Sequence, residues 1–173
     1  MSPPTDASVR DDIRGWLADA WDDDLGLLEW RERLVASGWA VPGWPRRWHG
    51  LELPARADKT VAEELARAGA VGPPLGGGMA LAAPTLLEHG HDALNEHLLR
   101  PTLTGELSWC QLFSEPGAGS DLAGLTTTAV RDGDEWVLNG QKVWNTSAHH
   151  ADVAMLLART DWDATKHQGI SYF

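Results

Sequence analysis

Residues 113–121, FSEPGAGSD, follow shortly after the point near Leu107 where the sequence changes from helical to extended periodicity. Residues 107–113 have the composition of a β-strand, and this strand enters a turn that is rich in glycine. Small residues let a ligand approach the backbone, and the free amides of such a turn can bind an anion. The turn has neither the lysine of a phosphate-binding loop nor the spacing of a dinucleotide fingerprint. These residues alone are compatible with a plain turn at a strand end and with a ligand-binding turn.

After this turn, the sequence predicts a series of short strands joined by tight turns. Asp132-Gly133 and Asn139-Gly140 are typical of hairpins, because their residues tolerate positive φ. The predicted pairing is an antiparallel meander, and its last strand is still in progress at Phe173. The expected strands are residues 107–113, 126–131, 135–138, 141–144, 153–158 and 169–173.

Before the turn, residues 1–106 predict an all-α domain. Apolar residues recur at helical spacing from Ile13 onward. Thr60 and Glu63 have the spacing of a capping box and predict the start of a helix. Pro101 predicts the end of the last helix, because proline lacks the backbone donor that a helix interior needs. The expected helices cover residues 13–21, 27–37, 60–68, 79–88 and 92–99.

The composition excludes several classes of protein. The formal net charge of -11 over 173 residues argues against a nonspecific nucleic-acid surface, which needs clustered Lys and Arg. Cys110 is the only cysteine, so neither an intramolecular disulfide nor a cysteine metal cluster is possible. His149-His150 has no metal-ligand spacing, and no metal site is expected. No segment is apolar enough for a signal peptide or a membrane span, which favours a cytoplasmic location.

A second motif lies at residues 139–147, NGQKVWNTS. Taken alone, it is compatible with a hairpin whose tryptophan, Trp144, faces the core. In this order and at this distance, the two motifs together closely resemble the acyl-CoA dehydrogenase family. The resemblance extends from about residue 10 to Phe173, and it includes GWAVP at 38–42, WP at 44–45 and APTLLEHG at 83–90.

The resemblance implies a fold. It predicts an α+β protein with an N-terminal all-α helical domain, residues 1–106, and an incomplete antiparallel β-barrel domain, residues 107–173. The C-terminal four-helix domain of the family, which carries the catalytic glutamate and much of the oligomer interface, is absent from these 173 residues. Glu115 belongs to the turn motif and does not correspond to the family's base. No catalytic residue is therefore expected within the sequence.

The resemblance also implies a site for FAD. Ser114 would hydrogen-bond the isoalloxazine edge, Trp144 would pack on the flavin rings, and Thr146 would donate a hydrogen bond to N5, which accepts hydride. Ser120 would lie near the flavin pyrophosphate and the pantetheine arm of the substrate, and it is the one expected substrate-binding residue. The expected cofactor-binding residues are Gln111, Leu112, Phe113, Ser114, Gly119, Ser120, Trp144, Asn145 and Thr146, of which Gln111 and Asn145 depart from the residues usual in the family.

The activity implied by the resemblance is FAD-dependent α,β-dehydrogenation of an acyl-CoA thioester to the 2-enoyl-CoA. The expected partners are the acyl-CoA substrate, an electron-transfer flavoprotein as electron acceptor, and subunits of the same family in a homo- or hetero-oligomer. Without the family's base, this chain alone is expected to be inactive. The alternatives are an oxygen-using flavoprotein of the same fold, such as a nitroalkane oxidase or flavin monooxygenase, and a noncatalytic subunit that completes a partner's site.

Overall fold

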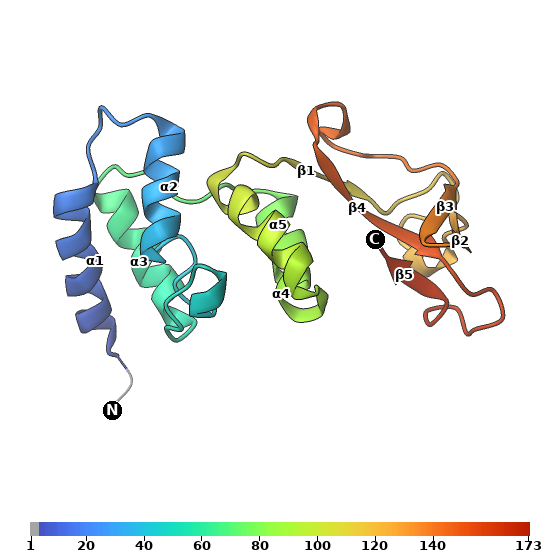
Figure 1. Ribbon diagram of the computed structural model, residues 1–173, viewed down its shortest axis with the longest axis horizontal. Coiled ribbons are helices and arrows are strands. Elements are labelled where there is room, and N and C mark those ends of the chain that lie inside the picture. Colours follow the sequence, from blue (N-terminus) through green and yellow to red (C-terminus); the bar gives the residue numbers. More distant parts are fainter. Residues whose placement is uncertain (1–3) are drawn as a thin grey trace. The chain divides into compact units, whose positions relative to one another are not determined.

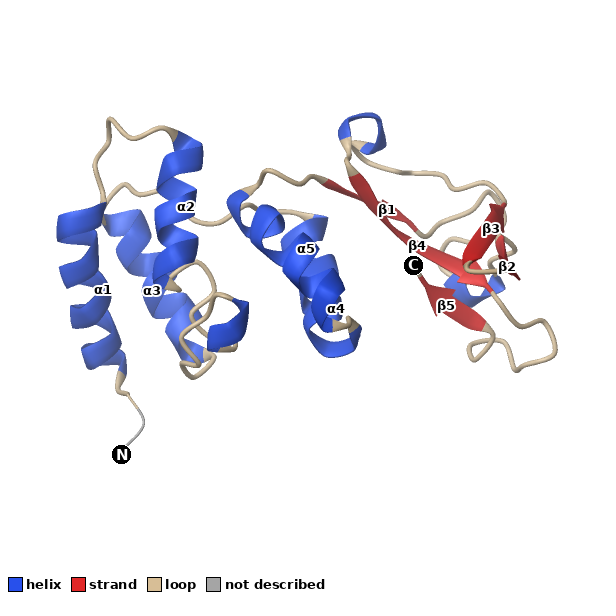
Figure 2. Ribbon diagram, in the orientation of Figure 1, coloured by secondary structure: helices blue, strands red, loops and turns tan. Residues whose placement is uncertain are grey.

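The computed structural model describes residues 4–173, and the chain divides into two compact units, Met1–Leu107 and Ser108–Phe173. The first unit is helical and the second is built on a β-sheet, as Figures 1 and 2 show. The α+β class predicted from the sequence is confirmed. No helix within residues 4–173 is both long and apolar enough to cross a membrane.

Local sequence explains the ends of the first helices of the helical unit. Thr5 caps the first helix: its hydroxyl accepts a hydrogen bond from the Ser8 amide, and the Ser8 hydroxyl accepts one from the Thr5 amide. Gly38 ends the second helix with a φ of 85°, a conformation that glycine adopts without steric cost. The helices of this unit are α1 (Asp6–Ala20), α2 (Leu27–Ser37), the short η1 (Arg46–Trp48), α3 (Arg56–Arg67), the π-helical η2 (Gly78–Ala82), α4 (Ala83–His89) and α5 (Asp92–Thr104).

The predicted start of α3 is wrong. The helix begins at Arg56, so that Thr60 lies inside it, is 5% exposed and does not act as an N-cap. The amide of Ala57 donates to the carbonyl of Pro54 over 2.7 Å, so the first turn of the helix is bonded directly to the end of the proline-containing loop. Burial of the face that carries Thr60 outweighs the local capping signal.

The predicted end of α5 is also wrong, because the helix continues through Pro101 to Thr104. Proline removes one backbone donor at this point. The hydroxyl of Thr102 donates to the carbonyl of Leu98 over 2.7 Å, and the side chain of Leu103 is completely buried. Packing of the last turn offsets the lost backbone bond.

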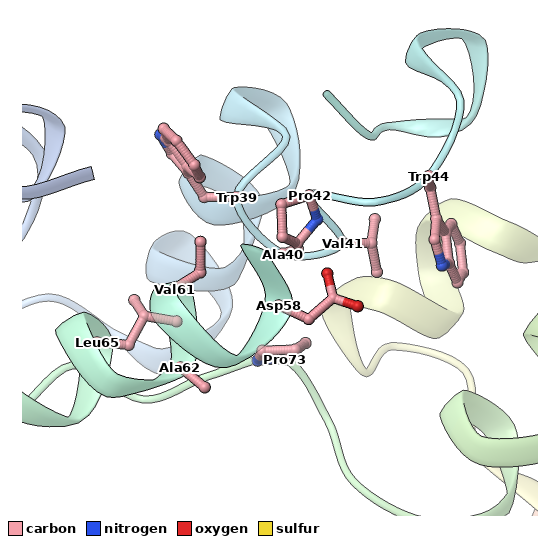
Figure 3. A pocket seen from close by; sticks show the side chains of 10 residues that line it. All are labelled: Trp39, Ala40, Val41, Pro42, Trp44, Asp58, Val61, Ala62, Leu65 and Pro73. Atoms are coloured by element: carbon pink, nitrogen blue, oxygen red, sulfur yellow. The ribbon is translucent and has the colours of Figure 1, made fainter. Parts of the chain in front are cut away.

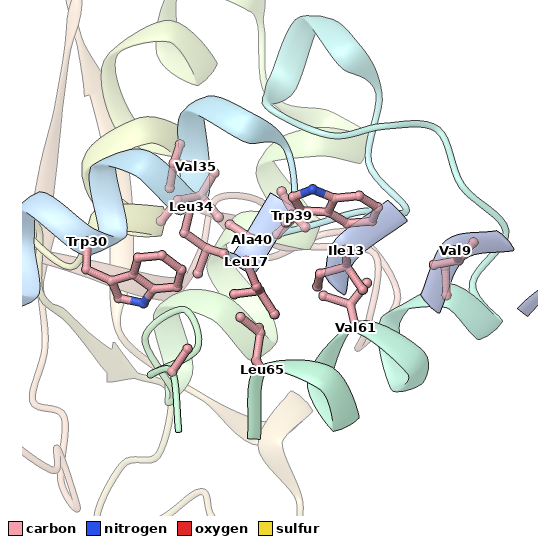
Figure 4. Packing of buried hydrophobic residues seen from close by; sticks show 14 residues of the cluster. Val9, Ile13, Leu17, Trp30, Leu34, Val35, Trp39, Ala40, Val61 and Leu65 are labelled. Atoms are coloured by element: carbon pink, nitrogen blue, oxygen red, sulfur yellow. The ribbon is translucent and has the colours of Figure 1, made fainter. Parts of the chain in front are cut away.

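The core of the helical unit lies where α1, α2 and α3 meet. Figure 4 shows Ile13 and Leu17 of α1 pointing toward Val61 and Leu65 of α3, with Leu34 of α2 beside them. All of these side chains are at most 5% exposed. The apolar periodicity of the sequence is thus used to build one shared core.

Trp30 of α2 extends this core. Its ring centroid lies 5.5 Å from that of Trp16 and 4.6 Å from that of Trp21, and the side chain is 1% exposed. The indole Nε1 donates to the carbonyl of Val71 over 2.6 Å. The buried ring therefore has a partner for its polar atom as well as apolar neighbours.

Glu64 of α3 makes the main polar link between α1 and α3. Its side chain is 1% exposed and forms ion pairs with Arg14 at 2.7 Å, with Arg67 at 2.7 Å and with Arg10. Hydrogen bonds from Arg14, Arg67 and Arg10 outweigh burial and lower the pKa of the Glu64 carboxyl to about 2. The carboxylate is a structural element of the helical unit.

The second unit contains one open five-stranded sheet (Figure 1). The strands β1, β4, β2 and β3 follow one another in that order, and β5 pairs with β4. Gly133, with a φ of 60°, forms the tight turn between β2 and β3. The strands are β1 (Trp109–Leu112), β2 (Thr128–Asp132), β3 (Glu135–Asn139), β4 (Val153–Arg159) and β5 (Ile170–Tyr172), and the short helices are η3 (Leu122–Gly124) and η4 (Ala148–His150).

The strand pairing differs from the predicted meander in two respects. Both β1 and β2 pair with β4 in parallel, while β2 with β3 and β4 with β5 are antiparallel. Residues 141–144, expected to be a strand, form a loop without regular secondary structure. Local turn signals locate the β2–β3 hairpin correctly, but they contain no information about the pairing of β1 with β4. Paired residues of these two strands, such as Trp109 and Val153, are 44 residues apart in the sequence.

Candidate functional site

The FSEPGAGSD motif forms a closed turn directly after β1. The amide of Glu115 donates to the carbonyl of Ala118 over 2.9 Å, and the amide of Ala118 donates back over 3.1 Å. Pro116 and Gly117 at the tip are exposed, whereas Ala118 is 2% exposed. The turn therefore has a fixed backbone, and the two residues after Ala118, which are predicted ligand contacts, are exposed.

The side chain of Glu115 is buried beneath this turn. One carboxylate oxygen accepts hydrogen bonds from the amide and the hydroxyl of Thr126, at 2.7 and 2.8 Å. The other accepts from the amide of Thr127 at 2.8 Å and from Nζ of Lys142 at 3.0 Å. The side chains of Glu115 and Lys142 are only 5% and 7% exposed, so they form a buried ion pair.

These contacts make Glu115 a poor base. Burial alone disfavours its charged form, but the hydrogen bonds from Thr127, Thr126 and Lys142 are together stronger and lower its pKa from 4.5 to about 2. A carboxylate with four donors and this pKa neither accepts a proton readily near neutral pH nor has a free oxygen to offer. The geometry supports the interpretation that Glu115 is not the family's base.

The low pKa of Glu115 predicts an acid-sensitive β unit. A carboxyl whose pKa falls from 4.5 to about 2 on folding stabilises the folded state above pH 4.5, and this stabilisation is lost as the pH falls toward 2. Hydrogen exchange of the β4 amides, measured from pH 6 down to pH 2, should therefore show a decreasing free energy of unfolding below about pH 4.5. Glu115→Gln, which has no titrating group, should flatten this part of the profile, and an unchanged profile in that variant would contradict the assignment.

The two motifs lie side by side in the β unit. Nζ of Lys142 donates to the carbonyl of Phe113 over 3.0 Å, and the amide of Val143 donates to the carbonyl of Ser114 over 2.9 Å. Adjacent residues of the second motif thus bond adjacent residues of the first. This pairing brings the end of β1 next to the segment that contains Trp144.

Trp144 is 90% exposed and has a positive φ of 62°, which is uncommon for a residue with a side chain. The interpretation of residues 139–147 as a hairpin with a core-facing tryptophan is therefore wrong. Thr146 is also exposed, and its amide donates to the carbonyl of Trp144 over 3.0 Å. Oδ1 of Asn145 is buried and has no hydrogen-bond partner among residues 4–173. The segment therefore combines an exposed aromatic residue, an exposed threonine and, between them, a buried unpaired acceptor.

The remaining predicted cofactor residues lie along the first motif. Gln111 and Leu112 belong to β1, with Gln111 exposed and Leu112 partly buried. Phe113 and Ser114 are partly buried at the strand end, where the second motif bonds them. The structure thus brings residues 111–114 together with the segment around Trp144.

Lys142 and Arg159 have roles that the sequence analysis missed. Arg159 at the end of β4 is 6% exposed, and its Nη2 donates to the carbonyl of Ala123 over 2.8 Å. Its guanidinium also lies 5.1 Å from the ring centroid of Trp162. Arg159 directly follows the apolar run of residues 153–158, and that pattern could have indicated a buried contact, whereas the mostly polar motif around Lys142 gives no such signal.

A separate cavity of about 210 Å³ lies in the helical unit (Figure 3). Asp58 is the only ionisable residue in its wall, and burial raises the pKa of that carboxyl although a backbone bond from Gly43 opposes the shift. The cavity contains none of the residues of the two motifs. Its lining residues are Trp39, Ala40, Val41, Pro42, Trp44, Asp58, Val61, Ala62, Leu65 and Pro73.

Both units match domain models of the same protein family. Residues 6–106 match the family model "Acyl-CoA dehydrogenase, N-terminal domain", and residues 110–173 match "Acyl-CoA dehydrogenase, middle domain". Acyl-CoA dehydrogenase FadE34 of Mycobacterium tuberculosis is 49% identical over 170 residues, which cover 96% of this chain and 23% of the relative. Acyl-CoA dehydrogenase IpdE1 of the same species is 38% identical over 180 residues, which cover 94% of this chain and 47% of the relative.

A solved structure shows the same arrangement of elements. The crystal structure of the ChsE4-ChsE5 complex from Mycobacterium tuberculosis matches 99% of this chain and 46% of that chain, with a TM-score of 0.69 and 33% sequence identity. The chain thus spans between about a quarter and about half of the length of these similar proteins.

Proposed function

Because this chain belongs to the acyl-CoA dehydrogenase family, we propose that it supplies FAD-binding segments of an enzyme that oxidises an acyl-CoA thioester to the 2-enoyl-CoA. One observation carries this proposal. The bond from the Val143 amide to the Ser114 carbonyl, 2.9 Å long, joins the two motifs, so that the exposed Trp144 belongs to the same surface as the end of β1.

The residues present fit the isoalloxazine ring of FAD, which is a flat aromatic system with polar edges. Trp144 offers a ring that is 90% exposed, and Thr146 offers an exposed hydroxyl. The buried Oδ1 of Asn145 has no donor within residues 4–173. Leaving such an atom unpaired costs about 1–3 kcal/mol, and a donor on the ligand would recover that cost.

FAD, when bound, supplies the hydride acceptor for the reaction. The residues of this chain would hold and orient it: Trp144 would pack on the rings, Thr146 would donate a hydrogen bond to N5, and Ser114 would hydrogen-bond the ring edge. Gln111, Leu112 and Phe113 line the same stretch. Ser120, next to Gly119 in the exposed part of the turn, would lie near the pyrophosphate of FAD and the pantetheine arm of the acyl-CoA.

The proton acceptor for the substrate α-carbon is a group outside residues 4–173. Removal of that weakly acidic proton needs a positioned base with a free lone pair. The carboxylate of Glu115 is fully hydrogen-bonded and has a pKa of about 2, so it does not meet this need. We assign the base to the family's glutamate, carried by another part of the assembly.

We further propose that the chain works in an assembly with another polypeptide of the same family. The ChsE4-ChsE5 complex, which contains a chain similar to this one, is by its name an assembly of two components. In this proposal, an acyl-CoA is the substrate, and an electron-transfer flavoprotein accepts the electrons from the reduced flavin.

The experiment that tests the cofactor proposal is a titration of the purified chain with FAD, followed by flavin fluorescence and visible circular dichroism. We expect Trp144→Ala to weaken FAD binding by about two- to tenfold, because a stacked aromatic pair contributes about 0.5–1.5 kcal/mol and 1.4 kcal/mol corresponds to a factor of ten. Trp162→Ala, at a tryptophan that is 61% exposed, is the matched control and should bind FAD like the original chain. Equal weakening by both substitutions, or a chain that binds no FAD, would count against the proposed site.

A further inference from the structure

We propose that Glu115 and Lys142 form a positioning pair for the flavin. Their buried ion pair holds the strand end that contains Ser114 at a fixed distance from the segment that contains Trp144. This inference rests on the proposed function, and it assigns a role to two residues that do not themselves touch the cofactor.

Three hydrogen bonds cross between the two motifs. Lys142 donates from Nζ to the Phe113 carbonyl and to the Glu115 carboxylate, both at 3.0 Å. Val143 donates from its amide to the Ser114 carbonyl at 2.9 Å. Two consecutive residues of the second motif, Lys142 and Val143, thus bind three consecutive residues of the first motif, 113–115.

A third segment, residues 126–127, is attached to the carboxylate of Glu115. The amides of Thr126 and Thr127, just before β2, donate to the two oxygens of Glu115 at 2.7 and 2.8 Å. Gly140, at the other end of the β2–β3 hairpin, packs so closely on this point that an added Cβ would lie 2.7 Å from Cα of Thr127. The hairpin that leads into Lys142 is therefore fixed at both ends near Glu115.

The backbone of Trp144 adopts a left-handed conformation. A φ of 62° is unfavourable for a residue with a side chain, and such a conformation persists only where the surroundings enforce it. The tryptophan side chain is 90% exposed and contributes little packing of its own. The bonds made by Lys142 and Val143, immediately before it, attach this part of the loop to the first motif, while the amide of Thr146 donates to the carbonyl of Trp144 within the loop.

Burial distinguishes the ion pair from the residues proposed to contact the flavin. The side chains of Glu115 and Lys142 are 5% and 7% exposed, whereas Trp144 and Thr146 are exposed. Both charges are satisfied within the β unit, so neither is left for a ligand. The pair acts on the flavin through Ser114 and Trp144, each of which lies within two residues of one of its members.

The test compares the original chain with the double variant Glu115→Gln/Lys142→Met, which removes both charges and nearly keeps the side-chain volumes. Lys166→Gln is the matched control, since Lys166 makes an ion pair with Asp121 at 2.6 Å in the same unit, but with side chains 52% and 66% exposed. Two quantities are measured: hydrogen exchange of the Val143 amide without FAD, and the dissociation constant for FAD. Exchange of the Leu156 amide in β4, which donates to Phe173, reports whether the sheet remains folded.

In the double variant, we expect Val143 to exchange at least roughly tenfold faster while Leu156 exchanges as before, and FAD to bind roughly tenfold more weakly; the control should change neither quantity. If the double variant fails to fold, Lys142→Arg takes its place, because it keeps the charge and should retain most of the FAD affinity that Lys142→Met loses. Unchanged Val143 exchange and FAD affinity in a folded double variant would overturn the positioning role and leave the proposed function intact. A chain that protects Val143 but binds no FAD would overturn both the proposed function and the role of the pair toward flavin.

Discussion

Replacing Trp30 by alanine is expected to lower the free energy of unfolding of the helical unit by about 3–5 kcal/mol. The side chain is 1% exposed and fills the space between Trp16 and Trp21, whose ring centroids lie 5.5 and 4.6 Å away. Alanine would leave a cavity that these rigid rings cannot collapse into, and it would leave the carbonyl of Val71 without its indole donor. Native-state hydrogen exchange of the slowest α3 amides measures this change directly.

Leu75→Ala is the control for this prediction. Leu75 belongs to the same unit and is 97% exposed, so its truncation removes almost no buried surface and should change the free energy of unfolding by less than about 0.5 kcal/mol. A loss below about 1 kcal/mol for Trp30→Ala would show that the tryptophan cluster is not part of the cooperative core.

The helical unit was largely predictable because its signals are local. Gly38 ends α2 in the left-handed conformation that its sequence position indicates, and the apolar residues from Ile13 onward do face the core. The first helix was expected from residue 13 but begins at Asp6, because the capping contacts of Thr5 and Ser8 were missed. Two other errors occur where tertiary packing overrides a local signal. Thr60 has the sequence context of a cap but is buried within α3, and Pro101 should end α5 but lies inside a helix whose last turn is held by burial of Leu103.

The β unit was predictable as a set of strands and less so as a sheet. Turn residues such as Asp132-Gly133 fix a hairpin between neighbours in sequence, and β2 and β3 pair as expected. Parallel pairing of β1 with β4 depends on contacts between distant residues, for which a single sequence has no local signal. The same limit applies to the site, where the two motifs could be recognised, but the bonds from Lys142 that join them could not.

The site residues also show the difference between what local sequence indicates and what contacts between distant residues determine. The exposure of Trp144 follows from a positive φ that no propensity indicates for tryptophan. The carboxylate of Glu115 is satisfied by four donors on two other segments, residues 126–127 and Lys142. A motif specifies which residues are present, whereas their exposure and charge state depend on what the rest of the unit places around them.

The second large effect is expected for Lys142→Met alone, which should lower the free energy of unfolding of the β unit by about 3 kcal/mol. Breaking a buried ion pair costs about 3–5 kcal/mol, because one charge remains desolvated without its partner. The lower end applies to Lys142→Met, since the amide and hydroxyl of Thr126 and the amide of Thr127 still donate to the carboxylate of Glu115.

The double variant Glu115→Gln/Lys142→Met should then be more stable than Lys142→Met alone, because replacing both partners leaves no uncompensated charge in the interior. The free energies of unfolding of the original chain, both single variants and the double variant form a cycle that isolates the coupling between the two side chains. Exchange of the β4 amides provides each value. Additive losses in this cycle would mean that the two side chains stabilise the unit independently. A positive coupling would show that the ion pair is one structural unit, and only in that case can it transmit a change at Lys142 to the strand end at Ser114.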